Sequence, residues 1–89
     1  MYYVYALLGL KNRRLYIGYT GNLARRIEEH NTGQGGKYTK KNKPFHLVFY
    51  EAFLSKEDAE KQERFYKTGY GREVLRKKIE NSISHCPVV

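Results

Sequence analysis

The 89-residue chain has room for one domain, and 40% apolar residues, with nine Tyr and four Phe, provide a core for it and argue against disorder. A single cysteine, Cys86, excludes an internal disulfide framework and fits a reducing, cytoplasmic location. The 17 Lys and Arg against nine Asp and Glu give a formal charge of +8. This charge favours nucleic-acid phosphates as partners over a generally basic soluble protein or a protein on anionic membranes. The apolar residues 1–10 are too few to span a bilayer.

The first third of the chain predicts a β-hairpin followed by a helix. Residues 2–8 are rich in β-branched and aromatic side chains and predict a strand, and residues 14–18 predict a second, antiparallel strand after a turn. Asn22 predicts the N-cap of a helix that runs to about Asn31. Gly33 lies just past that helix, where a left-handed residue is commonly needed.

A loop and a third strand come next. Residues 32–44 are rich in Gly, Lys and Asn, which indicates a loop. Residues 46–53 alternate well enough to predict a strand. We expect Leu47, Phe49 and Phe53 on one side of it.

Two helices are predicted at the C-terminal end. Ser55 with Asp58 three residues later matches a capping box and predicts a helix to about Thr68, ended by Gly69. Residues 72–82 predict a further helix. Its expected core positions are Val74, Leu75 and Ile79.

The order ββαβαα predicts an α+β domain: a three-stranded antiparallel sheet flanked by helices. We expect the domain to cover residues 1–83 and residues 84–89 to form a loosely ordered tail.

Two polar side chains of the first helix fall beside its apolar stripe. Arg26 and His30 are four residues apart and share a helix face. Leu23 and Ile27, also four apart, lie next to that face and should pack on the sheet. Arg26 and His30 are therefore expected to border the core, with two solvated side chains on a basic helix as the alternative.

A carboxylate lies on the core-facing stripe of the second helix. Ala59, Glu63 and Tyr66 are spaced four and three residues apart. A carboxylate at the core margin costs free energy unless a cation or a metal ion satisfies it. Metal ligation and a local ion pair both remain open for Glu63. Its basic neighbours are Lys61, Arg64 and Lys67.

Other chemistries find little support. One Cys and three scattered His show no zinc spacing, and no nucleophile elbow is present. The glycine-rich residues 33–37 follow a helix rather than a strand, which excludes a nucleotide-binding phosphate loop. Tyr5 and Tyr16 lie on the two strands of the predicted hairpin, and each of them, taken alone, is explained as a packing residue. The basic loop could still grip a phosphate backbone through Lys37, Lys40, Lys41 and Lys43.

Taken together, five of these features resemble the GIY-YIG nuclease family. Tyr3-Val4-Tyr5 stands at the GIY position and Tyr16-Ile17-Gly18 is an intact YIG. Arg26, His30 and Glu63 follow at the spacing of the family's arginine, its His or Tyr position, and its metal-binding glutamate. The resemblance covers nearly the whole chain. It is greatest to short, single-domain bacterial members related to the N-terminal nuclease module of excinuclease C.

The resemblance implies an endonuclease that hydrolyses a DNA phosphodiester in repair or recombination. It implies one Mg²⁺ or Mn²⁺ held by Glu63, and an Arg26 that binds the scissile phosphate. Tyr5 and Tyr16 would position or deprotonate the attacking water, and His30 would assist by hydrogen bonding or proton transfer. Lys67 would join the loop lysines in binding nucleic acid. A catalytically weak nucleic-acid-binding module and a scaffold for partner proteins are the alternatives.

Two positions depart from the family pattern. Tyr3 replaces the first glycine of GIY, and Tyr19 stands where some members have lysine. In a body this small, phosphate contacts and shape are expected to dominate over base readout, with DNA favoured over RNA. The sequence leaves the oligomeric state open.

Overall fold

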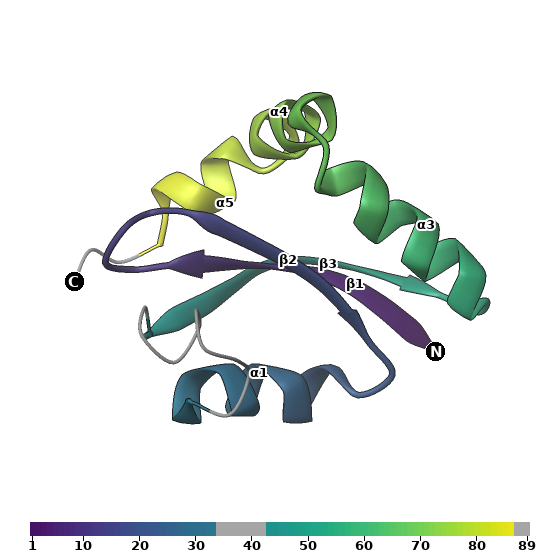
Figure 1. The fold of residues 1–89 in the computed structure, drawn as a ribbon. Coiled ribbons are helices and arrows are strands. Elements are labelled where there is room, and N and C mark those ends of the chain that lie inside the picture. The colour runs from purple at the N-terminus through teal and green to yellow at the C-terminus, as the bar shows by residue number, and fades with distance from the viewer. Residues whose placement is uncertain (34–42, 87–89) are drawn as a thin grey trace.

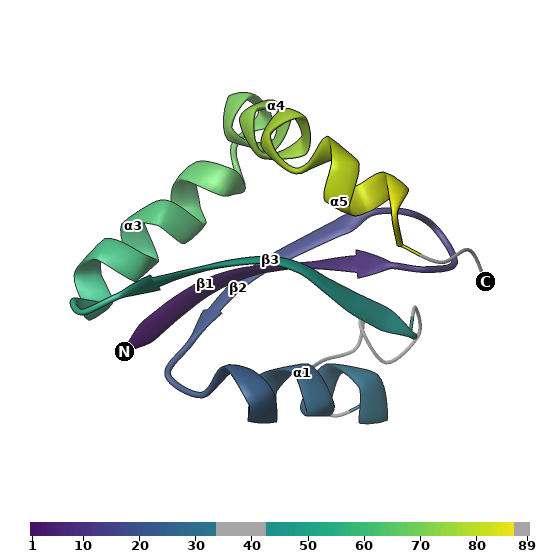
Figure 2. The same cartoon turned by 180° about the vertical axis from the view of Figure 1, so that it is seen from behind.

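Three antiparallel strands form a sheet with helices on both faces in the computed structural model, which describes residues 1–33 and 43–86 (Figure 1, Figure 2). β1 (Tyr2–Gly9) is the central strand, flanked by β2 (Leu15–Thr20) and β3 (Phe45–Phe53). The sheet order β2-β1-β3 makes β2 an edge strand. The predicted α+β class and the three-stranded antiparallel sheet are confirmed.

One helix covers one face of the sheet, and three helices cover the other. α1 (Leu23–Thr32) lies alone below the sheet in Figure 1. Above it run α3 (Lys56–Tyr66), α4 (Gly69–Lys78) and α5 (Glu80–Ser84). The order ββαβαα is confirmed, with the last predicted helix divided into α4 and α5.

The predicted signals at the two ends of α1 are confirmed. The Asn22 side chain accepts a hydrogen bond from the Arg25 N–H at 3.1 Å, so Asn22 is the N-cap. Gly33 has a φ of 90° and its N–H donates to the Glu29 carbonyl. These local interactions fix the length of the helix that carries Arg26 and His30.

The predicted capping box of the second helix is wrong. Ser55 precedes α3, but its side chain makes no capping hydrogen bond and instead donates to Glu57 Oε2 at 2.8 Å. Asp58 contributes only as an acidic residue in the first turn, where it favours the positive end of the helix dipole.

The boundary between the second and third predicted helices is also corrected. Gly69 does not end α3 but opens α4, because the Thr68 hydroxyl accepts the Gly71 N–H at 2.9 Å and acts as the N-cap. The predicted helix over residues 72–82 breaks at Ile79, whose φ of −117° and ψ of 23° are not helical. Ile79 is buried, and the break bends the chain so that Cys86 also reaches the core.

A β-bulge overturns the expected alternation in β3. Ala6 of β1 pairs with Phe49, but the next residue, Leu7, pairs with Leu47, which leaves Val48 as an extra residue. Leu47 therefore packs on the α1 side of the sheet, whereas Phe49 and Phe53 pack on the α3 side. The prediction that all three share one side is wrong.

Each face of the sheet has its own apolar cluster. The cluster between α1 and the sheet is the smaller one. Its buried residues are Tyr5, Leu7 and Phe45, and Leu23 and Ile27 of α1 pack against them. The larger cluster lies under α3–α5. Its buried members are Val4, Ala6, Leu8, Leu15, Ala59, Tyr66, Leu75, Ile79 and Cys86.

The C-terminal segment is described only in part. Ser84 is the last residue of α5 and Cys86 is 8% exposed, while residues 87–89 of the expected tail lie outside the described residues. The domain boundary after residue 83 stays a prediction. No helix within residues 1–33 and 43–86 is long and apolar enough to cross a membrane.

Asn31, at the end of α1, acts as a pairing partner for the first residue of β3. Its Oδ1 accepts the Phe45 N–H at 2.8 Å, and its Nδ2 donates to the Phe45 carbonyl at 3.2 Å. Asn31→Ala is expected to lower the free energy of unfolding by about 2 kcal/mol, because two part-buried backbone groups lose their partner. Urea denaturation measures this loss. Asn31→Asp keeps the shorter bond and should lose about half as much; equal losses would contradict the two-bond account.

Candidate functional site

The Tyr5 side chain crosses β2 at Gly18. Tyr5 and Gly18 are paired residues on neighbouring strands. A Cβ built on Gly18 would lie 2.7 Å from Tyr5 Cζ, closer than real Cβ atoms approach. The glycine of the YIG tripeptide therefore leaves the space through which the Tyr5 ring extends toward the sheet edge. Tyr16 lies two residues away on β2, opposite Leu7, as the predicted hairpin requires.

The Tyr5 hydroxyl contacts both Arg26 and His30 of α1. It lies 3.0 Å from His30 Nε2, and Arg26 also hydrogen-bonds to the phenol. His30 is 7% exposed, and Arg26 forms an ion pair with Glu29 at 3.1 Å. The expectation that Arg26 and His30 border the core is confirmed, since their helix packs through Leu23 and Ile27 on the Tyr5 cluster.

Burial fixes the protonation states of this group. It raises the pKa of the Tyr5 phenol, an effect that Arg26 opposes and that Glu63 and Glu29 reinforce. Burial, with a smaller contribution from Arg26, lowers the pKa of His30. At neutral pH the site therefore holds a phenol and a neutral imidazole.

These states give the hydrogen bonds a direction. A guanidinium can only donate, so Arg26 donates to the Tyr5 oxygen. The Tyr5 O–H is then left to donate to Nε2 of the neutral His30. This tautomer places the imidazole proton on Nδ1, which is buried and has no hydrogen-bond partner among the residues the structure describes.

Glu63 belongs to α3, on the opposite face of the sheet from α1. Its side chain is 18% exposed, and it lies on the stripe of the buried residues Ala59 and Tyr66, as predicted. Glu63 Oε2 is 3.1 Å from Lys67 Nζ, so the local ion pair, one of the two open alternatives, is present. The negative charge of Glu63 makes a lesser contribution to the raised pKa of the Tyr5 phenol, after burial.

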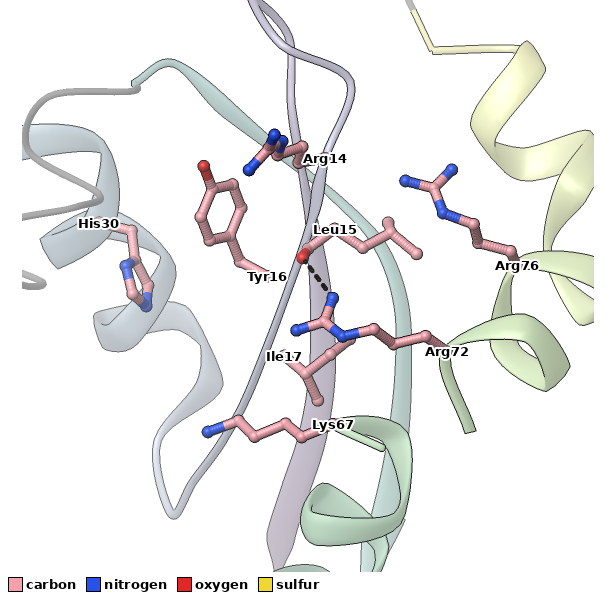
Figure 3. A pocket seen from close by; sticks show the side chains of 8 residues that line it. All are labelled: Arg14, Leu15, Tyr16, Ile17, His30, Lys67, Arg72 and Arg76. Carbon is pink, nitrogen blue, oxygen red and sulfur yellow. Dashed lines mark hydrogen bonds between the residues drawn. The ribbon is translucent and has the colours of Figure 1, made fainter. Parts of the chain in front are cut away.

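A cleft of about 600 Å³ lies along the edge strand β2 beside this group (Figure 3). His30 of α1 and the Tyr16 ring lie on one side of it, and Arg72 and Arg76 approach β2 from α4 on the other. Tyr16 is held by Asn12, whose Nδ2 donates to the hydroxyl at 3.1 Å, and by edge-to-face contact with Phe45. The full lining is Arg14, Leu15, Tyr16, Ile17, His30, Lys67, Arg72 and Arg76.

The structure brings some of the predicted site residues together and leaves others apart. The residues it gathers at this edge of the sheet are Tyr5, Tyr16, Arg26, His30, Glu63 and Lys67. Lys43 is exposed ahead of β3 and does not line the cleft. The remaining predicted nucleic-acid contacts, Lys37, Lys40 and Lys41, lie outside the described residues.

Two sets of functional candidates escaped the sequence analysis. Glu29 pairs with Arg26, and its position three residues along the helix was a readable signal. Arg72 and Arg76 are four residues apart and share the face of α4 that meets the cleft. Arg14 reaches the cleft from the hairpin. Sequence spacing did not reveal that these arginines converge, because it contains no information on how α4 crosses the sheet.

The donor set fits a hydrated divalent cation. Glu63 offers a hard oxygen donor that already has a cationic group within 3.1 Å. Within residues 1–33 and 43–86 no three His, Cys, Asp or Glu side chains come together as a metal cage. One carboxylate with water and phosphate oxygens is the binding that Mg²⁺ commonly uses.

The class to which this fold and site belong follows from comparison with known proteins. The family profile described as the GIY-YIG catalytic domain matches residues 1–79, and the chain belongs to the GIY-YIG family. Proteins of this family are typically nucleases that act on nucleic acid, so the domain is of a nuclease type.

Among similar proteins are two UPF0213 proteins. That in the ldhD 5′ region of Pediococcus acidilactici is 39% identical over 92% of this chain and 85% of its own length, and one from Staphylococcus haemolyticus is 44% identical over 89% and 94%. The solution NMR structure of a UPF0213 protein from Bacillus halodurans is 35% identical and aligns over the whole of both chains with a TM-score of 0.56.

The low pKa of His30 predicts a pH dependence of stability. An unfolded histidine titrates near 6.5, above the folded value, so the unfolded chain binds more protons once the pH falls to that value. The stability that His30 contributes is complete above pH 6.5 and is lost as the pH falls through the folded pKa. Denaturation at pH 7.5 and 5.5 should therefore show a larger loss for the natural protein than for His30→Gln. Equal losses would contradict a buried neutral imidazole.

Proposed function

We propose that the protein is an endonuclease that hydrolyses a phosphodiester bond of DNA with one Mg²⁺ or Mn²⁺ ion, a reaction suited to DNA repair or recombination. The observation that carries the proposal is the hydrogen-bonded chain from Arg26 through the Tyr5 phenol to neutral His30. A structural role alone does not require a buried imidazole nitrogen that has no hydrogen-bond partner among the residues that the structure describes.

Proton transfer through this chain answers a difficulty posed by Tyr5. Because its pKa is raised, the Tyr5 phenol is protonated at neutral pH and cannot by itself remove a proton from water. Because its O–H donates to His30 Nε2, the phenol can pass its proton to the imidazole as it accepts one from the attacking water. Tyr5 ends neutral and His30 becomes an imidazolium. The water oxygen forms its bond to phosphorus as the bond to the leaving oxygen breaks, and the leaving oxygen departs with the bonding electron pair and takes a proton from solvent water.

Arg26 is the group suited to hold the scissile phosphate. Its side chain is 35% exposed, and its guanidinium donates to Tyr5 and Glu29, which orient the planar fork of donors. A phosphate that binds Arg26 beside the Tyr5 hydroxyl lies next to the proton acceptor. Tyr16 lines the cleft and would position substrate or water there, whereas the Tyr5 hydroxyl hydrogen-bonds to His30.

Glu63 would hold the metal ion at the Tyr5 side of the cleft. A bound divalent cation relieves charge on the phosphate oxygens and lowers the pKa of a nearby water. The Lys67 ammonium pairs with Glu63 in the structure. If a divalent cation replaced it at Glu63, Lys67 would be available to contact a phosphate of the substrate.

Nicking of supercoiled plasmid by the purified protein tests the proposal. We expect conversion to open circles in Mg²⁺ or Mn²⁺ and none in EDTA. The Glu63→Gln variant, purified and assayed in parallel, shows whether a contaminating nuclease is responsible. Equal nicking in EDTA would refute the metal requirement.

A non-catalytic nucleic-acid-binding module is the second candidate, and the resting ion pairs favour it. Arg26 is paired with Glu29 and Glu63 with Lys67, so both charged groups of the mechanism already have partners. In this case the protein retards DNA in a gel, but cleaves none in either metal ion. Absence of both binding and cleavage would point to a scaffold.

A further inference from the structure

Three arginines with no acidic partner among the described residues line the cleft. Arg72 and Arg76 lie one helical turn apart on the α4 side, whereas the Arg14 side chain extends from the hairpin end of β2 toward Tyr16 (Figure 3). Arg72 Nη1 donates to the Leu15 carbonyl at a long 3.4 Å, and Arg76 Nη2 donates to the Arg13 carbonyl at 3.1 Å. Each of these two guanidinium groups thereby uses one of its five N–H donors.

Within the part of the chain that the structure describes, the charge of these three arginines is not compensated by a carboxylate. Among the described residues, none of Arg14, Arg72 and Arg76 forms an ion pair with a carboxylate, in contrast to Arg26 and Lys67. The cleft lining contains four cationic side chains and no Asp or Glu. Like charges gathered around one concave surface repel one another, and they are stabilised by an anion that enters it.

The cationic lining of the cleft is too long for a single phosphate. From Gly18, over which Tyr5 lies, to Arg14 the edge strand covers four residues, about 13 Å at roughly 3.3 Å per residue. One strand of duplex DNA carries a charge about every 3.4 Å along its axis. The spacing therefore suits successive phosphates of one backbone.

We propose that this cleft binds the phosphate backbone flanking the cleavage position, with Arg14, Arg72 and Arg76 as its contacts. The assignment of a cleavage position rests on the proposed nuclease function, whereas the binding of the backbone does not require catalysis. The bound DNA strand would run along the edge of β2 from the Arg26–Tyr5 group toward the hairpin. These contacts are independent of base sequence, because arginines here meet phosphates and not base edges.

The salt dependence of binding measures these contacts. Affinity for a fluorescein-labelled duplex oligonucleotide is followed by anisotropy in EDTA over a series of salt concentrations. Each lost phosphate contact lowers the slope of log K against log salt by about 0.9. Arg72→Gln/Arg76→Gln should therefore lower the slope by about 2, and Arg14→Gln by about 1.

A matched pair controls for net charge. Arg64→Gln/Lys77→Gln removes the same two charges from exposed positions that do not line the cleft, and it should leave the slope unchanged. Arg72 and Arg76 also hydrogen-bond to backbone carbonyls of Leu15 and Arg13, so their replacement can affect folding as well as binding. Arg14→Gln separates the two effects, because the Arg14 guanidinium forms no described hydrogen bond or ion pair. The thermal unfolding of Arg14→Gln should match that of the natural protein.

The inference is overturned if the control pair lowers the slope as much as the cleft pair, which would indicate diffuse charge. It is also overturned if Arg14→Gln leaves the slope unchanged, or if the natural protein binds no DNA. If the cleft variants have a lower salt-dependence slope but the natural protein never nicks plasmid, the backbone-binding cleft is supported and the nuclease function is refuted. If the natural protein nicks plasmid but the cleft variants bind DNA with an unchanged slope, the nuclease function is supported and the backbone-binding cleft is refuted.

Discussion

Glu63→Gln is expected to lower the rate of plasmid nicking by about 1,000-fold or more. Metal coordination to a phosphoryl oxygen contributes several kcal/mol to stabilisation of the transition state, and each 1.36 kcal/mol is a factor of ten. Glutamine has the shape of glutamate and lacks its charge, so it retains packing beside Ala59 and Tyr66 but not the cation. Initial rates in Mg²⁺ and in Mn²⁺ measure the effect.

The fold should survive this substitution. The ion pair between Glu63 and Lys67 is partly exposed, with the lysine side chain 50% accessible, so its loss costs at most about 1 kcal/mol. Glutamine can still accept a hydrogen bond from Lys67. An unchanged urea midpoint together with lost nicking would therefore assign the effect to the site.

Glu60→Gln is the matched control. Glu60 lies on α3 one turn before Arg64 and makes no described hydrogen bond or ion pair, so the variant removes the same charge from the same helix. We expect it to nick DNA at the rate of the natural protein. Retained nicking in Glu63→Gln, or an equal loss in Glu60→Gln, would show that Glu63 does not hold the ion.

The features predicted best from the sequence are those set by neighbours in the chain. Asn22 and Gly33 bound α1 through bonds within four residues, and the turn between β1 and β2 fixes the pairing of Tyr5 with Gly18. The helical spacing of Arg26 and His30 places both beside Tyr5. Much of the candidate site is therefore readable as three local patterns whose joint occurrence is specific to one family.

The features that escaped prediction depend on distant partners. The bulge at Val48 exists only in the pairing of β3 with β1, so alternation within β3 alone misplaced Leu47. The break at Ile79 follows from the burial of that side chain against the sheet. The convergence of Arg14 and Arg72 on one cleft requires the course of α4 across β2, which depends on the turn that precedes it.

That turn gives the second large expectation: Gly71→Ala should lower the free energy of unfolding by about 3 kcal/mol, the upper end for overpacking of a tight site. A Cβ on Gly71 would overlap the Phe65 carbonyl oxygen and lie 2.7 Å from its carbon. The obstructing atoms are backbone of α3, so no side-chain rotation relieves the clash. For a domain of this size such a loss corresponds to a fall in Tm of about 12–24 °C.

Gly69→Ala is the matched control and should have the opposite sign. No described atom lies within 4 Å of a Cβ at Gly69, the first residue of α4, and replacing glycine by alanine there restricts the unfolded chain, a gain of about 0.4–1 kcal/mol. Calorimetry of the two variants compares one chemical change at positions two residues apart. If both are destabilised, helix α4 rejects alanine for a reason other than contact with Phe65. If Gly71→Ala is neutral, the α3–α4 turn can open, and the course of α4 that brings Arg72 to the cleft is then not fixed by this glycine.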